Sequence, residues 1–293
     1  MTSVFWFRRD LRLQDNLALS QALRAGPVLA VSYLNLAEFA EMSAVRQHSL
    51  LASIDALNAS MRGQLNIRVV QNSAELASDL AALANASDSA SVYATEAFDT
   101  EGMGLQAKVR AELTAAGLQL VLNDSYYAVA PGLVRKPTDG APYKVFTPFS
   151  KAWLAHGWAR PAVLPDAVGW VTTALATRER PTPLPAPFKV VAGEVFALRT
   201  LERFLTQRVS GYAENRNRPD LGGTSHLSHA LAHGEIHPRT ILAKLPGGAG
   251  AEVFRSEVCW REFYADVLWH NPHTLDEYYD PKFAKLEYDA GTG

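Results

Sequence analysis

Short apolar runs alternate with longer stretches of helical periodicity over roughly the first 125 residues. The apolar runs predict strands at residues 3–7, 28–34, 65–70, 91–94 and 119–122. The stretches between them predict helices at residues 16–25, 44–61, 74–83 and 104–116. In the second helix Leu50, Ile54 and Leu57 recur at spacings of four and three, on one apolar face. This alternation predicts an α/β domain with a doubly wound parallel sheet covered by helices on both faces.

The pattern changes in the middle of the chain. Residues 157–188 hold six of the 16 prolines. Proline fixes φ and lacks an N–H, so this stretch predicts an extended connector rather than helix or sheet. Beyond it, helical segments without strands are expected at residues 195–208, 224–233, 237–245 and 252–270. We therefore expect an α/β domain at residues 1–130, a connector at 131–190 and a partial all-α domain at 191–293.

The composition is that of an ordinary globular protein, with 48% hydrophobic and 20% charged residues and a net charge of −2. A single cysteine, Cys259, excludes an internal disulfide framework and a cysteine-rich metal fold. No apolar run reaches the roughly 18 residues of a membrane span, and Arg8 and Arg9 interrupt any signal-type core. We therefore expect a cytoplasmic protein with no membrane partner.

Charge is distributed unevenly along the chain. Residues 199–261 contain nine Lys or Arg and six Asp or Glu. This excess suits a phosphate-bearing partner, but on charge alone solvated helix faces are the favoured explanation.

A glycine motif beginning at Gly102 matches the dinucleotide fingerprint G-x-G-x-x-A. About eight residues separate it from the preceding strand, among them the acids Glu96, Asp99 and Glu101. Because the carboxylates would repel a pyrophosphate, we do not expect a nicotinamide-type site there.

Three histidines, His226, His229 and His233, have spacings that could bring imidazoles to one face of a helix. Only Glu235 is nearby to orient the rings, and Gly234 ends the helix before a fourth histidine could join. Partly buried or surface histidines explain the cluster better than a zinc site, so no metal is expected.

Residues 5–19, FWFRRDLRLQDNLAL, form the first of three notable clusters. An apolar strand is followed by a burst of charge, and then by Asp15 as the predicted N-cap of the next helix. We expect Arg8, Asp10 and Arg12 to pair with one another structurally.

Residues 211–239 form the second cluster. Two adjacent glycines, Gly222 and Gly223, permit an unusual turn, and Thr224 and Ser225 follow at a predicted helix start. Unpaired amides and hydroxyls at a helix start form an anion site. An ordinary capped helix, with Leu227 in the core and its neighbour Ser228 on the polar side, is the alternative.

Residues 252–272 form the third cluster. On a helix Phe254, Glu257 and Arg261 fall in one line, and Trp260 stands beside Glu257. An exposed indole next to a carboxyl group can stack on a flat base while the acid reads its hydrogen-bonding edge. The alternative is a core tryptophan with a surface Glu257–Arg261 ion pair.

With these clusters, the chain resembles the DNA photolyase/cryptochrome family, and most closely the bacterial photolyases that repair cyclobutane pyrimidine dimers. The matching motifs are FRRDLRLQDNLAL from residue 7, YKVFTPFSKAW from 143, TSHLSHALAHGEIHPR from 224 and WREFY from 260. The resemblance implies an N-terminal α/β antenna domain, a long connector and a helical domain that holds a folded-back FAD. It implies deoxyribodipyrimidine photo-lyase activity: excited, fully reduced flavin donates an electron to the dimer, the cyclobutane bonds split, and the electron returns.

By the family pattern, several residues would contact FAD: Tyr212, Thr224, Ser225, Leu227 and Ser228 at the phosphates, with Phe254 and Arg261 along the flavin cavity. Glu257 and Trp260 would face a dimer flipped out of damaged double-stranded or single-stranded DNA. The flavin does the chemistry, so no side chain is expected to be catalytic.

The sequence departs from the family pattern in several places. His226 stands where relatives usually have Arg or Lys, and Phe254 where many have Trp. Thr100 and Glu101 match an Asn–Glu pair of folate-binding relatives, so Glu101 is the candidate residue for a second antenna chromophore, a folate or a deazaflavin.

The sequence ends at Gly293, where family members continue through a further helical half. We therefore expect a monomeric fragment that folds its α/β domain, binds FAD poorly and does not repair DNA alone. A cryptochrome-type blue-light photoreceptor and a non-enzymatic α/β binding module are the alternative functions.

Overall fold

A parallel sheet lies at the centre of the computed structural model, which describes residues 2–166 and 168–286. Its main strands are β1 (Thr2–Phe7), β2 (Val28–Asn35), β3 (Asn66–Val70), β4 (Ser89–Thr95) and β5 (Gln119–Asn123). They run in the order β3-β2-β1-β4-β5, with parallel pairing throughout. The predicted strands and the α/β class are confirmed.

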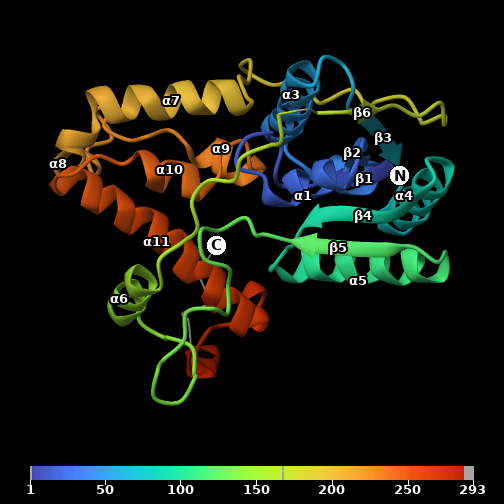
Figure 1. Cartoon of the computed structure of the whole chain (residues 1–293). Coiled ribbons are helices and arrows are strands. Elements are labelled where there is room, and N and C mark those ends of the chain that lie inside the picture. Colours follow the sequence, from blue (N-terminus) through green and yellow to red (C-terminus); the bar gives the residue numbers. More distant parts are fainter. Residues whose placement is uncertain (1, 167, 287–293) are drawn as a thin grey trace, which may run out of the picture.

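Helices cover both faces of this sheet (Figure 1). They are α1 (Leu17–Ala25), α2 (Leu36–Glu41), α3 (Ala44–Ser60), α4 (Ser73–Ala86) and α5 (Thr100–Ala115). Along β1, Val4 and Trp6 pack on the face of α4 and α5, whereas Phe5 and Phe7 pack with α1 and α3. The short helix α2 was not predicted from the sequence; Asn35 caps it by accepting a hydrogen bond from Ala37 N at 3.1 Å.

The proline-rich segment is partly sheet, which corrects the prediction that it would contain none. Strand β6 (Trp170–Val171) pairs with β2 at Val28 and Leu29. The pairing is possible because β3 begins to pair with β2 only at Val31, which leaves the first residues of that edge free.

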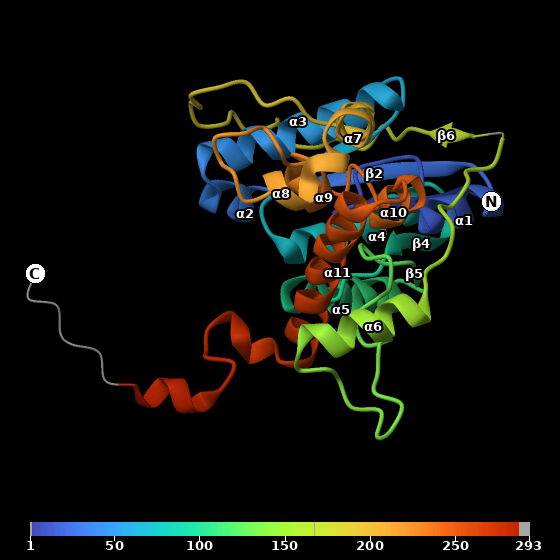
Figure 2. The same cartoon turned by 90° about the vertical axis from the view of Figure 1, so that its left-hand side faces the viewer.

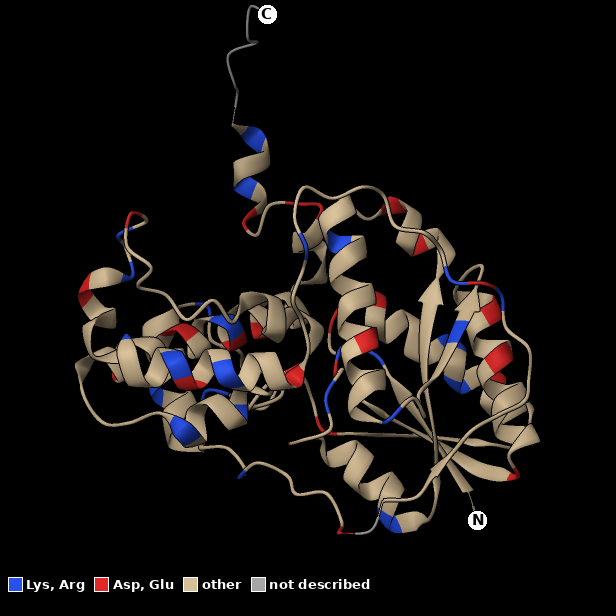
Figure 3. Cartoon of the chain, turned by 90° about the horizontal axis from the view of Figure 1, so that it is seen from above, with Lys and Arg blue, Asp and Glu red and all other residues tan. Residues whose placement is uncertain are grey.

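Beyond the sheet the chain is helical. Its elements are α6 (Phe146–His156), α7 (Glu194–Gln207), the 3₁₀ turn η1 (Val209–Gly211), α8 (Tyr212–Asn215), α9 (Ser228–His233), α10 (Pro238–Lys244), α11 (Ala249–His270), and the 3₁₀ turns η2 (Pro272–Leu275) and η3 (Pro281–Lys285). Figure 2 shows α6 beside α11, and both belong to one apolar core. Figure 3 shows Lys and Arg interspersed with Asp and Glu on these helices. The last residues of the predicted helical domain, 287–293, lie outside the described residues.

Helix α9 begins four residues later than predicted. His226 has a left-handed φ of 55°, and Leu227 is the N-cap, so Thr224 and Ser225 lie in a loop rather than at a helix start. The prediction failed because nothing in the local sequence marks His226 as the position where the helical backbone is interrupted.

A buried polar network joins the sheet to the helical part. Asp15 was predicted to cap α1, but Asn16 does so, accepting from Leu19 N at 3.0 Å. Asp15 instead has a φ of 51° and accepts from Arg239 at 2.9 Å and from Thr240 Oγ1 at 2.9 Å. Arg239 also pairs with Asp124 at 2.6 Å. Buried ion pairs therefore join the two parts.

The side chains of Arg8, Asp10 and Arg12 do not pair with one another, which corrects the expected pairing, although Asp10 Oδ1 accepts a hydrogen bond from the backbone Arg8 N at 2.8 Å. Their side-chain partners are Gln106 Oε1 and Gly102 O for Arg8, Thr95 Oγ1 and Asn16 Nδ2 for Asp10, and the carbonyls of Asp15 and Gly234 for Arg12. Among the described residues, no helix combines the length and the apolar character needed to cross a membrane.

Candidate functional site

The first turn of α11 packs tightly against η1 and α8. A Cβ on Gly250 would lie 1.8 Å from Val209 O, so only glycine allows this approach. The close packing brings Tyr212 and Phe254 together, with ring centroids 5.2 Å apart, beside Phe204. Both predicted cofactor residues are thus buried in an aromatic cluster.

The loop at residues 224–228, here called the hydroxyl turn, lies against α8. A Cβ on Gly223 would lie 2.7 Å from Asn215 Cβ, so this glycine serves a close approach; neither it nor Gly222 has a left-handed φ. Leu227 is buried in the core, and Ser225 Oγ accepts from Leu227 N at 3.4 Å. Within the described chain, the hydroxyls of Tyr212, Thr224 and Ser228 make no hydrogen bond to a protein group. They are free to bind a polar ligand.

Arg261 lies two turns further along α11, facing the loop that follows β5. Its Nη1 donates to Tyr126 O at 3.1 Å, and the guanidinium stacks 4.6 Å from the ring centroid of Tyr127. Burial lowers the pKa of Arg261. Its other N–H groups have no acceptor among the described residues, although an arginine carries five donors. A partly buried cation with unused donors suits an anionic or carbonyl-rich ligand.

Glu257 and Trp260 both line one side of α11, but neither is isolated. Glu257 forms an ion pair with Arg216, not with Arg261, and both side chains of the pair are about one-third exposed. Trp260 is half-buried and stacks on Phe146, with centroids 3.6 Å apart and an interplanar angle of 7°. Arg216 cannot be recognised from the sequence as the partner of Glu257, because 41 residues separate the two. The local pattern alone could not reveal such a pair.

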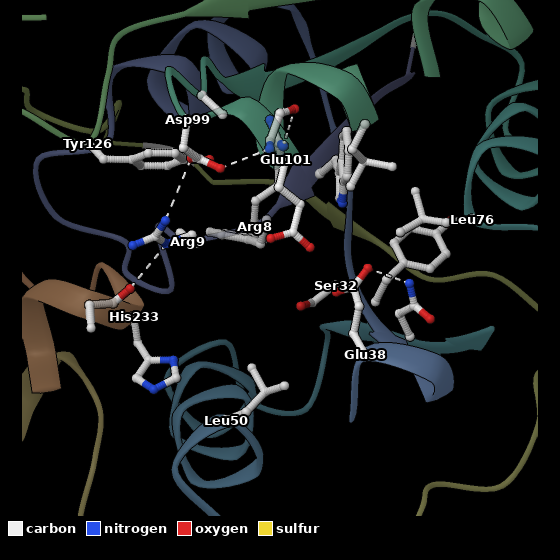
Figure 4. Close-up of a pocket in the computed structure, with 18 of the residues that line it drawn as sticks. Arg8, Arg9, Ser32, Glu38, Leu50, Leu76, Asp99, Glu101, Tyr126 and His233 are labelled. Atoms are coloured by element: carbon white, nitrogen blue, oxygen red, sulfur yellow. Dashed lines mark hydrogen bonds and ion pairs between the residues drawn. The ribbon is translucent and has the colours of Figure 1, made fainter. Parts of the chain in front are cut away.

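A cavity of about 310 Å³ opens at the carboxyl ends of β1, β2 and β4 (Figure 4). In open α/β sheets, ligands bind at such ends, where the strand order changes direction. Glu101 lines this cavity, together with Arg8, Glu38, Asp99 and Tyr126. Burial, followed by the nearby charge of Glu101, raises the pKa of Glu38. Of this polar lining, only Glu101 is predicted from the sequence as a ligand-binding residue.

The same cavity is bordered by the helical part through Ala232 and His233 at the end of α9. Burial lowers the pKa of His233 to about 4. The ring of His229 is tilted against that of His233, with centroids 4.7 Å apart, and its Nδ1 lies 3.6 Å from Glu235 Oε2. No group of three or more His, Cys, Asp or Glu residues in the described ranges has a metal-binding arrangement.

Comparison with known proteins identifies relatives along the whole chain. The family model for DNA photolyase matches residues 3–166. The deoxyribodipyrimidine photo-lyase of one Thermus thermophilus strain is 31% identical over 97% of this chain and 64% of its own length. That of Alkalihalophilus pseudofirmus is also 31% identical, over 92% of this chain and 60% of its own.

A solved structure described as a bacterial class III photolyase from Agrobacterium tumefaciens has a TM-score of 0.83, with 25% identity. The match covers 99% of this chain and 63% of the Agrobacterium chain. An archaeal photolyase from Sulfolobus tokodaii, described with two FAD molecules, is similar in fold, with a TM-score of 0.79 and 20% identity over 99% of this chain and 64% of its own. The chain therefore spans a little over three fifths of the length of these relatives.

Proposed function

Because the chain belongs to the DNA photolyase family, we propose that it acts in light-driven repair of cyclobutane pyrimidine dimers, with FAD as cofactor. The relatives reported above are named photo-lyases, which favours repair over a cryptochrome-type photoreceptor or a non-enzymatic binding module. In this proposal residues 1–130 form the antenna domain, 131–190 the connector and 191–293 the first part of the FAD-binding domain.

The observation that carries the proposal is that Arg261 on α11 has unused hydrogen-bond donors. Arg261 is partly buried, yet it donates only one hydrogen bond to an oxygen of the described residues. FAD would supply the missing acceptors, because its ring carbonyls and its diphosphate accept hydrogen bonds. The free hydroxyls of Tyr212, Thr224 and Ser228, with Ser225 and the apolar Leu227 and Phe254, complete the set that would hold it. When bound and reduced, FAD supplies the electron that splits the dimer.

Glu257 and Trp260 are assigned to the lesion. A carboxylate accepts a hydrogen bond from a pyrimidine N–H, and Arg216 holds the Glu257 carboxylate in place. The half-buried indole of Trp260 offers stacking area next to that acid. Arginines near Glu257 and Trp260 would contact phosphates of the DNA backbone. The affinity for DNA should therefore decrease as the salt concentration rises.

The cavity at the strand ends is assigned to a second, antenna chromophore, a folate or a deazaflavin. Glu38, Asp99 and Glu101 accept hydrogen bonds from N–H groups of a heterocycle and disfavour a phosphate. Tyr126 and Trp6 supply flat apolar walls. The strandedness of the DNA, the monomeric state and the cytoplasmic location remain predictions.

Replacing Trp260 by alanine tests the proposed lesion site. We expect Trp260→Ala to weaken binding of a dimer-containing oligonucleotide by about 1–3 kcal/mol, because stacking on the indole is lost. Binding of the undamaged oligonucleotide should stay the same. Fluorescence anisotropy with both oligonucleotides measures this difference.

Trp158→Ala is the matched control. Trp158 is also half-buried and packs against another aromatic ring, Trp153, at 4.5 Å. It should leave the preference for damaged DNA unchanged. An equal loss for damaged and undamaged DNA in Trp260→Ala would exclude Trp260 from the lesion site.

A further inference from the structure

Two aromatic rings flank the indole of Trp260. Phe146 lies parallel to it, with centroids 3.6 Å apart and planes 7° apart. Tyr264, one turn later on α11, lies 5.5 Å away at 25°. A ring that stacked at 5.5 Å on the face covered by Phe146 would also contact Phe146, and among the described residues no such contact joins Phe146 to Tyr264, so Tyr264 does not share that face. We call these three residues the aromatic stack. A pyrimidine that stacks on Trp260 must therefore displace one neighbour.

The two neighbours differ in how firmly they are held. Both rings contact Phe263, with centroids 5.8 Å away for Phe146 and 5.7 Å away for Tyr264, but Phe146 also begins α6, whose Phe149 and Trp153 are buried in the core. Moving Phe146 would expose apolar surface and disturb that helix start. Tyr264 is 62% exposed, and its hydroxyl makes no hydrogen bond within the described chain. A rotation about its χ1 moves the ring into water at little cost.

The position of the Tyr264 ring relative to the indole also makes Tyr264 the neighbour that is easier to displace. Its ring is tilted and 5.5 Å from the indole, whereas Phe146 covers the other face at van der Waals distance. The face toward Tyr264 is thus only partly covered. It is also the face that can be opened without changing the core.

We propose that Tyr264 is a displaceable cap on the lesion-binding face of Trp260 and that Phe146 is the fixed support behind it. Both are positioning residues, and the inference rests on the lesion site proposed above. In the free protein Tyr264 shields the indole from water. In the complex the pyrimidine takes its place, so that Phe146, Trp260 and the base form one column.

Affinity measurements test the cap. Displacing an aromatic neighbour costs binding energy, so Tyr264→Ala should bind a dimer-containing oligonucleotide about two- to tenfold more tightly than the wild type. Tyr264→Phe keeps the ring and should bind like the wild type. Tyr279→Ala removes a tyrosine of similar type, 44% exposed on the C-terminal segment, and should have no effect. Unchanged or weakened binding by Tyr264→Ala would overturn the proposal.

Fluorine NMR of the 5-fluorotryptophan-labelled chain separates this inference from the lesion site itself. The chain has six tryptophans, and Trp260→Phe assigns the resonance. In the free protein, Tyr264→Ala and Phe146→Leu should each shift it, because each removes a stacked ring. With the dimer-containing oligonucleotide, the wild type and Tyr264→Ala should converge on one shift, whereas Phe146→Leu should stay different.

The possible failures are distinct. If the wild type and Tyr264→Ala keep their free-state difference when DNA is bound, Tyr264 is not displaced and the cap is wrong, while Trp260 can still face the lesion. If the Trp260 resonance does not respond to bound DNA, or the damaged oligonucleotide does not bind at all, the proposed lesion site fails and this inference fails with it.

Discussion

At the residue scale, His237 is held neutral by the hydrogen bonds of its ring. Its Nε2 donates to Ser125 O at 2.9 Å, and its Nδ1 accepts from Arg239 N at 3.1 Å as the N-cap of α10. A proton on Nδ1 would point at the N–H of Arg239, and two N–H groups cannot form a hydrogen bond with each other. Burial, followed by the charges of Arg12 and Arg239, lowers the pKa of His237 well below its usual value. Asp15, 3.5 Å from Nδ1, already accepts hydrogen bonds from Arg239 and Thr240.

This neutrality predicts a loss of stability in acid. Below a pH of about 6.5 the unfolded chain takes up a proton on this histidine that the folded chain excludes, so protons favour unfolding. The free energy of unfolding should fall by up to about 1.4 kcal/mol per pH unit there, relative to His237→Asn, which can cap α10 without titrating. Urea unfolding between pH 7 and pH 5 measures the difference, and parallel profiles would contradict it.

The sequence revealed the residues of the proposed lesion site better than their partners. A spacing of three on one helix brings Glu257 next to Trp260. The partners of these residues, Arg216 and Phe146, come from other elements, and only tertiary packing brings them close. The role of Asp15 could not be predicted from the sequence either. Its backbone is left-handed and its carboxylate contacts Arg239, instead of capping a helix.

At the element scale, the end of α9 depends on one glycine. Gly234 is the left-handed C-cap, with φ 67°, and a Cβ there would lie 1.9 Å from Arg9 O. Gly234→Ala should destabilise the fold by more than about 2 kcal/mol, since it adds a backbone clash to the cost of a left-handed alanine. Thermal or urea unfolding measures this change.

Gly117→Ala is the control for the backbone cost alone. Its φ is 74°, but a Cβ there would meet nothing within 4 Å. This variant should lose only about 1 kcal/mol. Equal losses in the two variants would show that α9 does not press against the Arg9 loop.

Periodicity predicted the five main strands and most of the longer helices, but it missed α2, α6 and β6 and did not fix the limits of the elements. The alternating apolar runs of the sheet are strong patterns, and the strands were found where predicted. Strand β6 was missed because its pairing depends on a free edge of β2, a property of the assembled sheet. Helix α9 was extended too far because the interruption at His226 leaves no trace in hydrophobicity.

At the scale of the whole molecule, Arg239 holds the sheet and the helical part together. It pairs with Asp15 and Asp124, and all three side chains are buried. Arg239→Met leaves two buried carboxylates without their cation, so the free energy of unfolding should drop by about 3–5 kcal/mol. Arg218→Ala breaks an exposed pair with Asp220 and should leave the free energy of unfolding almost unchanged, because solvent screens this pair. Similar losses in both variants would show that the junction adds little stability.

The cavity at the strand ends could not be predicted as a whole from the sequence. Its lining combines the ends of three strands with α9, from Trp6 to His233 along the chain. Glu101 was identified only through a family resemblance. The position of the cavity, in contrast, agrees with the general rule for parallel sheets, which depends on strand order alone.

Binding of FAD to the purified chain tests the central claim most directly. Flavin fluorescence during titration should show weak, saturable binding that Arg261→Leu weakens at least about tenfold, because a charged donor to the flavin is lost. Arg255→Leu, on the same helix, should bind like the wild type. If Arg261→Leu and Arg255→Leu bind FAD equally well, or the wild type does not bind it, α11 does not form part of a flavin site.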